Sequence, residues 1–302
     1  MGITNKSKSV LDRLKNQAKK ASLPFQTVLQ LFAQEEFLRK LSLSKYNENF
    51  ILKGGMLIYT LTNYESRPTK DIDFMLRNLS SKLDDISAAI ENICRIDTDN
   101  DFILVNLTKV EQIGTKKHYP GARISLLATI DKVKIPFSID IGINDAVVPP
   151  PVKRTIKPRL EDFSSPEIYI YSLESTVAEK FDAILERMSA TSRMKDFFDI
   201  YYLQRRFDFD GGFLQRALKS TLKHRNRKIY ADAFIDIKTF ASNKYLLKQW
   251  GNFKPAADAC LSFENVITGI NDFLEPVYKA IIENGRFKGK WDCVSQVWKF
   301  KN

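Results

Sequence analysis

The sequence is poor in the residues that build disulfide-bonded domains, zinc sites and membrane spans. It contains three cysteines and two histidines in 302 residues. Cys94, Cys260 and Cys293 lie far apart and form no C-x-x-C pair, which argues against the common zinc and redox motifs. No run approaches the ~18 consecutive apolar residues that a membrane-spanning helix needs. We therefore expect reduced thiols and no membrane partner.

The N-terminus also lacks a recognisable targeting signal. Its first residues include no apolar core of a signal peptide, and Lys6 stands where a myristoylation signal has serine or threonine. We therefore expect a cytoplasmic protein.

Acidic residues are fewer than basic ones. The chain has 47 lysines and arginines against 36 aspartates and glutamates, a formal net charge of +11. Such a surface attracts polyanions, of which nucleic acid is the commonest large one in a cell. The alternative is a basic surface with no nucleic-acid partner. Apolar residues make up 44% of the chain, enough for a substantial core, and the length favours two domains or lobes.

Hydrophobic periodicity divides the first half of the chain into two regions. Helical spacing of apolar residues predicts helices at 8–22 and 26–43, within an N-terminal region of residues 1–45. Residues 46–150 alternate between helix and strand periods and form a predicted mixed unit of helices and strands. The elements predicted there are a helix from Gly55, a strand at 71–76, a helix at 80–93, and strands at 102–110, 122–130 and 133–143.

The run Pro149-Pro150-Pro151 marks the next boundary, because proline cannot continue a central strand or a helix interior. We interpret the stretch from there to Pro166 as a connecting loop. Residues 151–302 form a mostly helical lobe, with helices predicted at 173–188, 195–204, 212–223, 229–243 and 256–281. The predicted fold class is α+β, with a small mixed sheet flanked by helices and followed by a mostly α-helical C-terminal lobe.

The strand predicted at 71–76 carries the strongest chemical signal. Alternation places Asp71 and Asp73 on one face and three apolar side chains on the other. Two carboxylates about 6–7 Å apart along a strand repel each other unless a cation lies between them. Oxygen ligands suit magnesium, with manganese as a substitute. The alternative is a solvated strand face that binds no ion.

A third carboxylate, Asp140, comes from the strand predicted at 133–143. This strand alternates strictly, so that Ser138 and Asp140 share a polar face opposite a row of apolar side chains. If it pairs beside the strand at 71–76, three carboxylates meet on one side of the sheet. That is the ligand set for two magnesium ions in phosphoryl transfer.

Two glycines, Gly54 and Gly55, precede the carboxylate strand at the start of a predicted helix. Free backbone N–H groups and the positive end of the helix dipole can approach a triphosphate closely there. Considered alone, the pair is better explained as an ordinary loop-to-helix turn. The order of glycines, helix, turn, Asp-x-Asp strand and third-Asp strand is more specific than any of its members.

This order of motifs resembles the polymerase-β-like nucleotidyltransferase superfamily. The segments KGG at 53–55 and RPTKDIDF at 67–74 look like one branch of it, the AbiEii/AbiGii type IV toxins of bacterial toxin–antitoxin and abortive-infection systems. The 15 residues between the glycines and the Asp-x-Asp strand exceed the superfamily's commonest spacing. In the helical lobe, AEKFDA at 178–183 and RMKDFFDI at 193–200 are similar to the family's helical motif.

The resemblance covers about residues 50–203 and implies roles for individual residues. The metal ions would be held by Asp71 and Asp73. The nucleotide pocket would be shaped by Gly54, Gly55, Arg67 and Thr69.

The helical lobe would complete the active site with Lys180 and Asp196. Lysine can place a point charge on a nucleotide phosphate, and the aspartate can orient the lysine or act as a base. Asp199 lies on the same helix face as Asp196, so either is a candidate for that role. The alternative is that these residues are solvated helix faces making i,i+4 pairs.

By the same resemblance, the protein would transfer a nucleoside monophosphate from an NTP to RNA in a bacterial or archaeal cytoplasm. The family's acceptor is the 3′ end of tRNA, where addition blocks charging and stops translation. A cognate antitoxin would be a further partner, and Thr69 matches a position where some of these toxins are neutralised by phosphorylation. Its hydroxyl can equally cap the turn before the strand. The alternative functions are a non-catalytic protein of this fold that binds RNA or an antitoxin, and a protein-modifying phosphotransferase.

Two basic segments are candidate RNA contacts. Residues 216–228 include seven basic or imidazole side chains in 13 positions. Residues 286–301 interleave aromatic rings with cations, as a stacking platform for a single strand or a tRNA end would. The alternative for this second segment is that its tryptophans pack on the helical lobe while its lysines stay in water.

Overall fold

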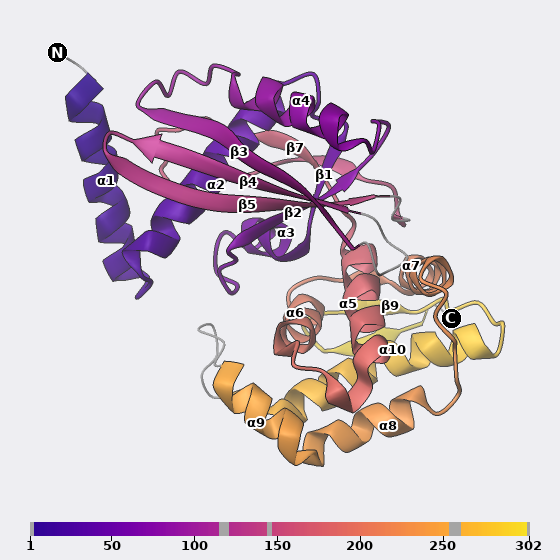
Figure 1. The fold of residues 1–302 in the computed structure, drawn as a ribbon. Coiled ribbons are helices and arrows are strands. Elements are labelled where there is room, and N and C mark those ends of the chain that lie inside the picture. Colours follow the sequence, from indigo (N-terminus) through magenta and orange to yellow (C-terminus); the bar gives the residue numbers. More distant parts are fainter. Residues whose placement is uncertain (1–2, 115–120, 144–146, 254–260, 301–302) are drawn as a thin grey trace. The chain divides into compact units, whose positions relative to one another are not determined.

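The computed structural model describes residues 3–114, 121–143, 147–253 and 261–300, and the chain divides into two compact units. Unit 1 consists of Met1–Tyr64, Pro68–Asn144 and Val152–Ile170. Unit 2 consists of Glu65–Arg67, Asp145–Pro151 and Tyr171–Asn302. Figure 1 traces the chain through both units, from the indigo N-terminal helices to the yellow C-terminal segment.

Unit 1 is built on a seven-stranded mixed sheet in the order β3-β4-β5-β2-β1-β7-β6. Its elements are α1 (Ile3–Lys20), α2 (Phe25–Leu43), β1 (Phe50–Lys53), α3 (Gly54–Leu61), β2 (Asp71–Leu76), α4 (Leu83–Cys94), β3 (Ile103–Ile113), β4 (Gly121–Ile130), β5 (Val133–Ile143), β6 (Val152–Thr155) and β7 (Glu167–Ile170). The β2–β5 and β1–β7 pairs are parallel, and the remaining pairs are antiparallel.

The apolar face of the sheet packs against α2. Phe37 of this helix contacts Phe74 of β2 and Phe137 of β5, with ring centroids 6.3 and 6.5 Å apart. Ile72 and Ile139 are fully buried on the same two strands. Strand alternation therefore directs the apolar side chains of β2 and β5 toward the core and leaves their polar side chains on the opposite face.

α2 is buried nearly all round and carries an ionic network in its interior. Arg39 forms ion pairs with Glu35 and Glu36, and all three side chains are at most 1% exposed. Glu35 also accepts a hydrogen bond from the backbone N–H of Arg159, and Glu36 accepts one from the Asn100 amide. Pairing of this kind removes the high cost of an isolated buried charge. The network ties two loops of unit 1 to the helix.

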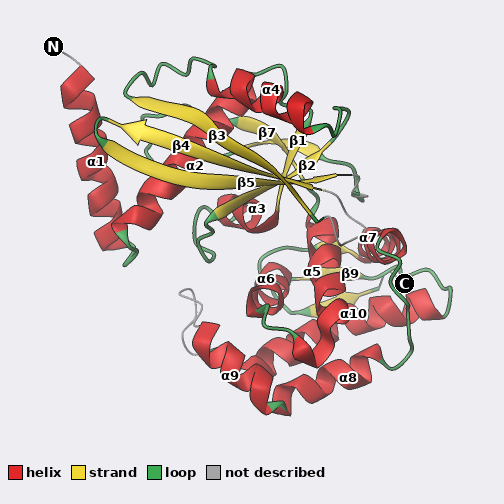
Figure 2. Ribbon diagram, in the orientation of Figure 1, coloured by secondary structure: helices red, strands yellow, loops and turns green. Residues whose placement is uncertain are grey.

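Unit 2 is largely helical, with a small three-stranded sheet in the order β10-β9-β8 (Figure 2). Its elements are α5 (Leu173–Arg187), α6 (Met194–Gln204), β8 (Phe209–Asp210), α7 (Gly211–His224), α8 (Ala233–Thr239), α9 (Lys244–Phe253), α10 (Phe263–Ile282), β9 (Lys290–Asp292) and β10 (Val297–Lys299). Aromatic rings fill its core. Phe181 of α5 stacks on Phe234 of α8 and meets Tyr278 of α10 edge-on. Together the two units confirm the predicted α+β class.

Several elements differ from the prediction. The segment interpreted as a loop before Pro166 contains β6, and the strands β1 and β7 were also missed. These strands have four residues each, which is too short for a reliable period: every residue of β6 is exposed, and the alternation of β7 covers only two repeats. The helix predicted at 229–243 begins only at Ala233, and α9 follows it. In the helix predicted at 256–281, residues 256–260 lie outside the described residues.

Among the described residues, no helix combines the length and the apolar character that crossing a membrane requires.

Candidate functional site

The carboxylates predicted from the sequence lie on two neighbouring strands of unit 1. β2 and β5 run parallel, with Asp71 opposite Ser138 and Asp73 opposite Asp140. Residues directly opposite each other on paired strands have their side chains on the same face. The Ser138 hydroxyl donates a hydrogen bond of 2.9 Å to Asp71 Oδ1. The pairing of β5 beside β2, on which the third carboxylate depended, is therefore confirmed.

Gly54 brings the start of α3 against this polar face. Its φ of +68° lies in the left-handed region that glycine adopts readily. A Cβ added at this position would overlap the carboxylate of Asp73. Glycine is therefore required here both by the backbone conformation and by the close approach. With Gly55 it forms the first turn of α3, where backbone N–H groups are not used within the helix.

Asp140 is engaged by an arginine. Arg123 of β4 lies directly opposite Asp140 of β5 and donates two hydrogen bonds to it, from Nε to Oδ1 at 2.7 Å and from Nη2 to Oδ2 at 2.6 Å. Within the described part of the chain, no three His, Cys, Asp or Glu side chains form a group that could hold a metal ion. Two adjacent carboxylates, Asp71 and Asp73, still offer the hard oxygen donors that a magnesium ion prefers. The assignment of Asp140 as a metal ligand stays a prediction.

Unit 2 contains a buried ionic cluster built from α5 and α6. Lys180 Nζ lies 2.6 Å from Asp199 Oδ2 and 3.4 Å from Asp196 Oδ1. Arg67 donates two hydrogen bonds to Asp199, at 2.8 and 2.6 Å. Arg193 donates one of 2.5 Å to Asp196. The residues singled out in the two helical motifs thus contact one another, and the alternative of solvated helix faces is wrong for Lys180, Asp196 and Asp199, because each is at least nine-tenths buried.

The cluster fixes the protonation of its members. Burial alone would lower the pKa of Lys180, but the charges of Asp199 and Asp196 outweigh burial and raise it. Burial would likewise raise the pKa of Asp196, but Lys180 and Arg193 lower it below its ordinary value. A carboxylate with a lowered pKa is a weak base. Asp196 is therefore better suited to positioning Lys180 than to removing a proton.

Two residues assigned to the nucleotide pocket have partners of their own. The Arg67 guanidinium belongs to unit 2, where it is paired with Asp199. The Thr69 hydroxyl donates a hydrogen bond of 3.2 Å to the backbone oxygen of Asp71. By this bond the hydroxyl caps the turn before β2, which is the alternative role considered for Thr69. Contacts of either residue with a nucleotide stay predictions.

The basic segment 216–228 is only partly available to a ligand. Arg227 donates a 2.8 Å hydrogen bond to the fully buried carboxylate of Asp182 on α5, and Arg225 lies 3.7 Å from the same carboxylate. These arginines hold the loop after α7 against α5. The exposed cations of the segment are Arg216, Lys219, Lys223 and Lys228.

The tryptophans of the C-terminal segment pack on unit 2. Trp291 is 2% exposed, and its indole N–H donates a hydrogen bond of 2.7 Å to the backbone oxygen of Gln204. Trp298 stacks on Phe273 with parallel rings 5.7 Å apart. Its N–H donates a 3.0 Å bond to the backbone oxygen of Phe273. The packing alternative is confirmed for both tryptophans, whose rings are therefore not free platforms for bases.

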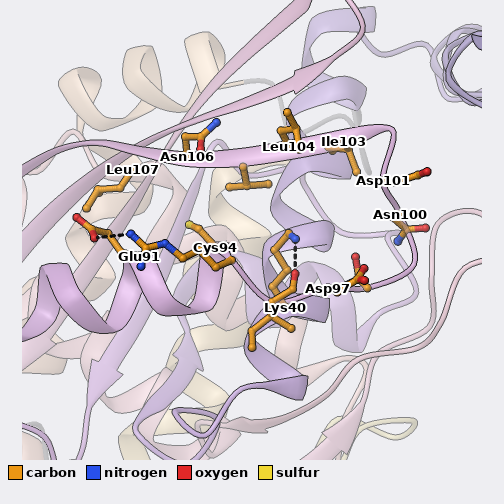
Figure 3. Close-up of a pocket in the computed structure, with 14 residues that line it drawn as sticks. Lys40, Glu91, Cys94, Asp97, Asn100, Asp101, Ile103, Leu104, Asn106 and Leu107 are labelled. Carbon is orange, nitrogen blue, oxygen red and sulfur yellow. Dashed lines mark hydrogen bonds and ion pairs between the residues drawn. The ribbon is translucent and has the colours of Figure 1, made fainter. Parts of the chain in front are cut away.

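A cavity of about 550 Å³ lies elsewhere in unit 1, between the end of α4, the loop that follows it and β3 (Figure 3). Lys40 donates a 2.6 Å hydrogen bond to the backbone oxygen of Ile96 there, and Arg95 pairs with Glu91 at 3.4 Å. Burial raises the pKa of the Cys94 thiol in its wall to about 12. None of the residues predicted for the active site lines this cavity.

Sequence reasoning missed Arg123. The only available signal was its place on the strand predicted at 122–130, where it alternates with the buried Ala122 and Ile124. That pattern shows that Arg123 faces away from the core but does not reveal its neighbour. Recognising the pair with Asp140 requires the register between β4 and β5.

Comparison with known proteins agrees with the predicted family and fold. The family profile described as "Nucleotidyl transferase AbiEii toxin, Type IV TA system" matches residues 36–266. No curated protein sequence matches the chain. Among solved structures, the chain is similar to MenT4, a nucleotidyltransferase toxin from Mycobacterium tuberculosis, with 13% identity and a TM-score of 0.51 over 92% of this chain and 98% of that one. It is also similar to JHP933 from Helicobacter pylori, with 13% identity and a TM-score of 0.48 over 86% and 94%.

Proposed function

This chain belongs to the AbiEii family of nucleotidyltransferase toxins, and we propose that it transfers a nucleoside monophosphate from an NTP to the 3′ end of an RNA, namely the acceptor end of tRNA. Addition at that end would block charging with an amino acid and stop translation. The observation that carries the proposal is the pair Asp71 and Asp73 on the polar face of β2, with Gly54 at the start of α3 directly against it.

The proposed reaction is an in-line substitution at the α-phosphorus. The 3′-hydroxyl oxygen forms a bond to that phosphorus, the bond to the pyrophosphate oxygen breaks, and the hydroxyl proton passes to solvent. A magnesium ion, or manganese in its place, would supply Lewis-acid stabilisation of the phosphate charge when bound. Asp71 and Asp73 are the residues proposed to hold it. The Ser138 hydroxyl orients Asp71 by its hydrogen bond.

The first turn of α3 is proposed to bind the triphosphate. The backbone N–H groups that form no hydrogen bond within the helix, together with the positive end of the helix dipole, attract anions. Gly54 and Gly55 have no side chains of their own to shield that backbone, so that phosphate oxygens would approach it beside the carboxylate of Asp73.

The residues of unit 2 are proposed to act through charge. Lys180 stays protonated because two carboxylates surround it, and an ammonium group is a suitable point charge for phosphate oxygens. Asp196 and Asp199 are then positioning residues for Lys180. The exposed lysines of segment 216–228 would contribute sequence-independent attraction to the RNA backbone.

A cognate antitoxin is the other partner proposed for the protein. Phosphorylation of Thr69 would be one route of neutralisation, because this residue lies two positions before Asp71 and its hydroxyl already contacts the backbone of that residue. A phosphate there would add about −1.5 to −2 charges beside the carboxylate pair. It would repel an incoming triphosphate.

The test is label transfer to RNA by the purified protein. Total tRNA is incubated with magnesium and each of the four α-labelled NTPs, using the parent, Asp71→Asn and the control Asp85→Asn. Asp85 is an exposed carboxylate in the first turn of α4. We expect labelling by the parent and the control, and a loss of at least about 100-fold with Asp71→Asn, because the ion loses a charged ligand.

The alternative functions give different outcomes. RNA binding by the parent without labelling by any NTP would identify a non-catalytic binding protein. Label that reaches protein from γ-labelled but not α-labelled ATP would identify a phosphotransferase. Equal labelling by Asp71→Asn and the parent would contradict the proposed site.

A further inference from the structure

A row of charged side chains crosses the polar face of the unit 1 sheet, one from each of five adjacent strands. Strand pairing sets the row in the order Lys53, Asp73, Asp140, Arg123 and Glu111. Its second and third members are the neighbouring carboxylates of β2 and β5. On the β4 side, the next member is a cation in contact with Asp140.

The contact between Arg123 and Asp140 uses both oxygens of the carboxylate. A two-bond arginine–carboxylate pair is among the strongest ionic contacts in proteins and has a fixed geometry. The hydrogen bonds to Asp140 are the main cause of the raised pKa of Arg123, and the charge of Asp71 contributes to the same shift. Arg123 therefore belongs electrostatically to the group of carboxylates predicted to bind metal.

The guanidinium retains donors beyond those given to Asp140. Arginine has five N–H groups, of which two point at Asp140 in this pair. The Arg123 side chain is 47% exposed, so the remaining donors are open to a ligand. Phosphate oxygens match this planar donor pattern.

We propose that Arg123 is a permanent positive charge of the active site. It holds Asp140 out of the metal-binding set, so that Asp71 and Asp73 bind one divalent ion, and it donates hydrogen bonds to a phosphate of the bound NTP. This inference rests on the proposed function, because it concerns the ion and nucleotide of the same site.

The balance of charge supports a single ion. Together with Asp71, the row carries four negative charges against the two positive charges of Lys53 and Arg123, so that one divalent cation balances the remainder. Without the guanidinium, the pair of Asp73 and Asp140 on neighbouring strands would lose the cation that contacts Asp140. Such a pair would attract a second divalent ion or bind the first more tightly.

The test measures Mn²⁺ binding to the full-length protein by electron paramagnetic resonance, without nucleotide. The variants are Arg123→Gln, the double variant Arg123→Gln/Asp140→Asn, and the control Lys134→Gln. Lys134 is an exposed cation of β5, six residues from Asp140 and thus about 20 Å along the strand. Its replacement removes one positive charge, as Arg123→Gln does, but from β5 and not from β4. Because Arg123 is half exposed, its replacement leaves the core unchanged.

We expect one bound Mn²⁺ in the parent and in the control. Arg123→Gln should bind a second ion or bind the first about tenfold more tightly, because the repulsion by the guanidinium is gone. The double variant should return to the parental affinity, which shows that Asp140 mediates the gain. In label transfer, Arg123→Gln should also raise the KM for NTP about tenfold through the lost phosphate contact.

Mn²⁺ binding by Arg123→Gln that equals the parent's would overturn the inference, as would a parent that already binds two ions. Asp71→Asn separates the two proposals. If it abolishes Mn²⁺ binding while Arg123→Gln changes nothing, the metal site stands and the role of Arg123 fails. A parent that binds no Mn²⁺ would overturn both.

Discussion

At the residue scale, the polar face depends on a position where only glycine fits. Gly54 combines a positive φ with contact between its Cα region and the carboxylate of Asp73. A methyl group there would displace that carboxylate from its place on β2. The geometry of the predicted metal ligand and the start of α3 are thus coupled through one residue.

We expect Gly54→Ala to reduce nucleotidyl transfer at least about 100-fold, because the ligand carboxylate moves. It should also lower the free energy of unfolding by about 1–3 kcal/mol through backbone strain. Label transfer and urea denaturation measure the two effects. Gly251→Ala is the control, since a Cβ at this position of α9 meets nothing within 4 Å. Parental activity in Gly54→Ala would show that the site tolerates this displacement.

The buried cluster of unit 2 makes a second residue-scale prediction, on pH. The pKa of Asp196 is lowered in the folded protein by Lys180 and Arg193 against the effect of burial. A carboxylate with a lowered folded-state pKa stabilises the fold above its unfolded value of about 3.9, and this contribution is lost as the pH falls through the folded-state pKa. Asp196→Asn cannot make this contribution at any pH.

The difference in unfolding free energy between the parent and Asp196→Asn should therefore be largest near neutral pH. It should shrink as the pH is lowered below about 4. Urea denaturation over a pH series measures it, with Asp85→Asn, which removes an exposed carboxylate, as the control variant. A difference that is constant with pH would mean that the charge of Asp196 does not contribute to stability.

At the scale of elements, the C-terminal strands form part of the core of unit 2. β9 and β10 pair with each other and with β8, and Trp291 and Trp298 meet Phe273 of α10 from these strands. The described lysines of the segment, Lys288, Lys290 and Lys299, are exposed, while the indoles are packed. The alternation of aromatic and basic residues, which suggested a stacking platform, is therefore explained by strands that have one buried face.

We expect Trp298→Ala to lower the free energy of unfolding by about 2–4 kcal/mol, because it removes a half-buried indole and its hydrogen bond. RNA affinity, measured below the melting temperature, should stay within twofold of the parent. Phe300→Ala is the aromatic control, since this ring is 60% exposed. A large loss of RNA affinity without loss of stability would restore the platform interpretation for Trp298.

At the scale of the whole molecule, not every cationic side chain that contributes to the net charge of +11 is available to bind a polyanion. In the basic segment 216–228, Arg225 and Arg227 are used to hold acidic groups of α5. The exposed lysines of the same segment remain to attract a polyanion. RNA binding should therefore depend on these lysines, whereas the arginines should matter for stability.

We expect the triple variant Lys219→Gln/Lys223→Gln/Lys228→Gln to weaken tRNA binding and to reduce the slope of log affinity against log salt by about 2–3, because each phosphate contact contributes about 0.7–0.9. Fluorescence anisotropy over a KCl series measures the slope. A matched triple variant of exposed lysines in unit 1, Lys15→Gln/Lys82→Gln/Lys132→Gln, removes the same net charge. Equal slopes in the two triple variants would assign RNA binding to net charge alone.

Much of the fold was predictable from local pattern. The long helices of both units and the strands β2, β4 and β5 have enough residues for a helical or alternating period to show. The short strands β1, β6 and β7 do not, because four residues provide too few repeats and their pairing is with distant segments. Helix α8 begins later than the pattern indicated, at Ala233.

The sequence by itself determined which side chains share a face. Strict alternation placed Asp71 and Asp73 together on β2, and helical spacing placed Asp196 and Asp199 together on α6. These relations are local, because the periods of strand and helix fix them once the element forms. The motif order in the same segments also indicated the family, which the match over residues 36–266 confirms.

Only the tertiary structure decided which strands pair in which register and which helix faces contact each other. The register of β5 against β2 and β4 placed Asp140 beside Asp73 and opposite Arg123, and a slip of one residue would have reversed the face. The packing of α5 on α6 likewise brought Lys180 to Asp196. These contacts join residues distant in the chain, so their formation depends on the free energy of the whole core and not on any local period.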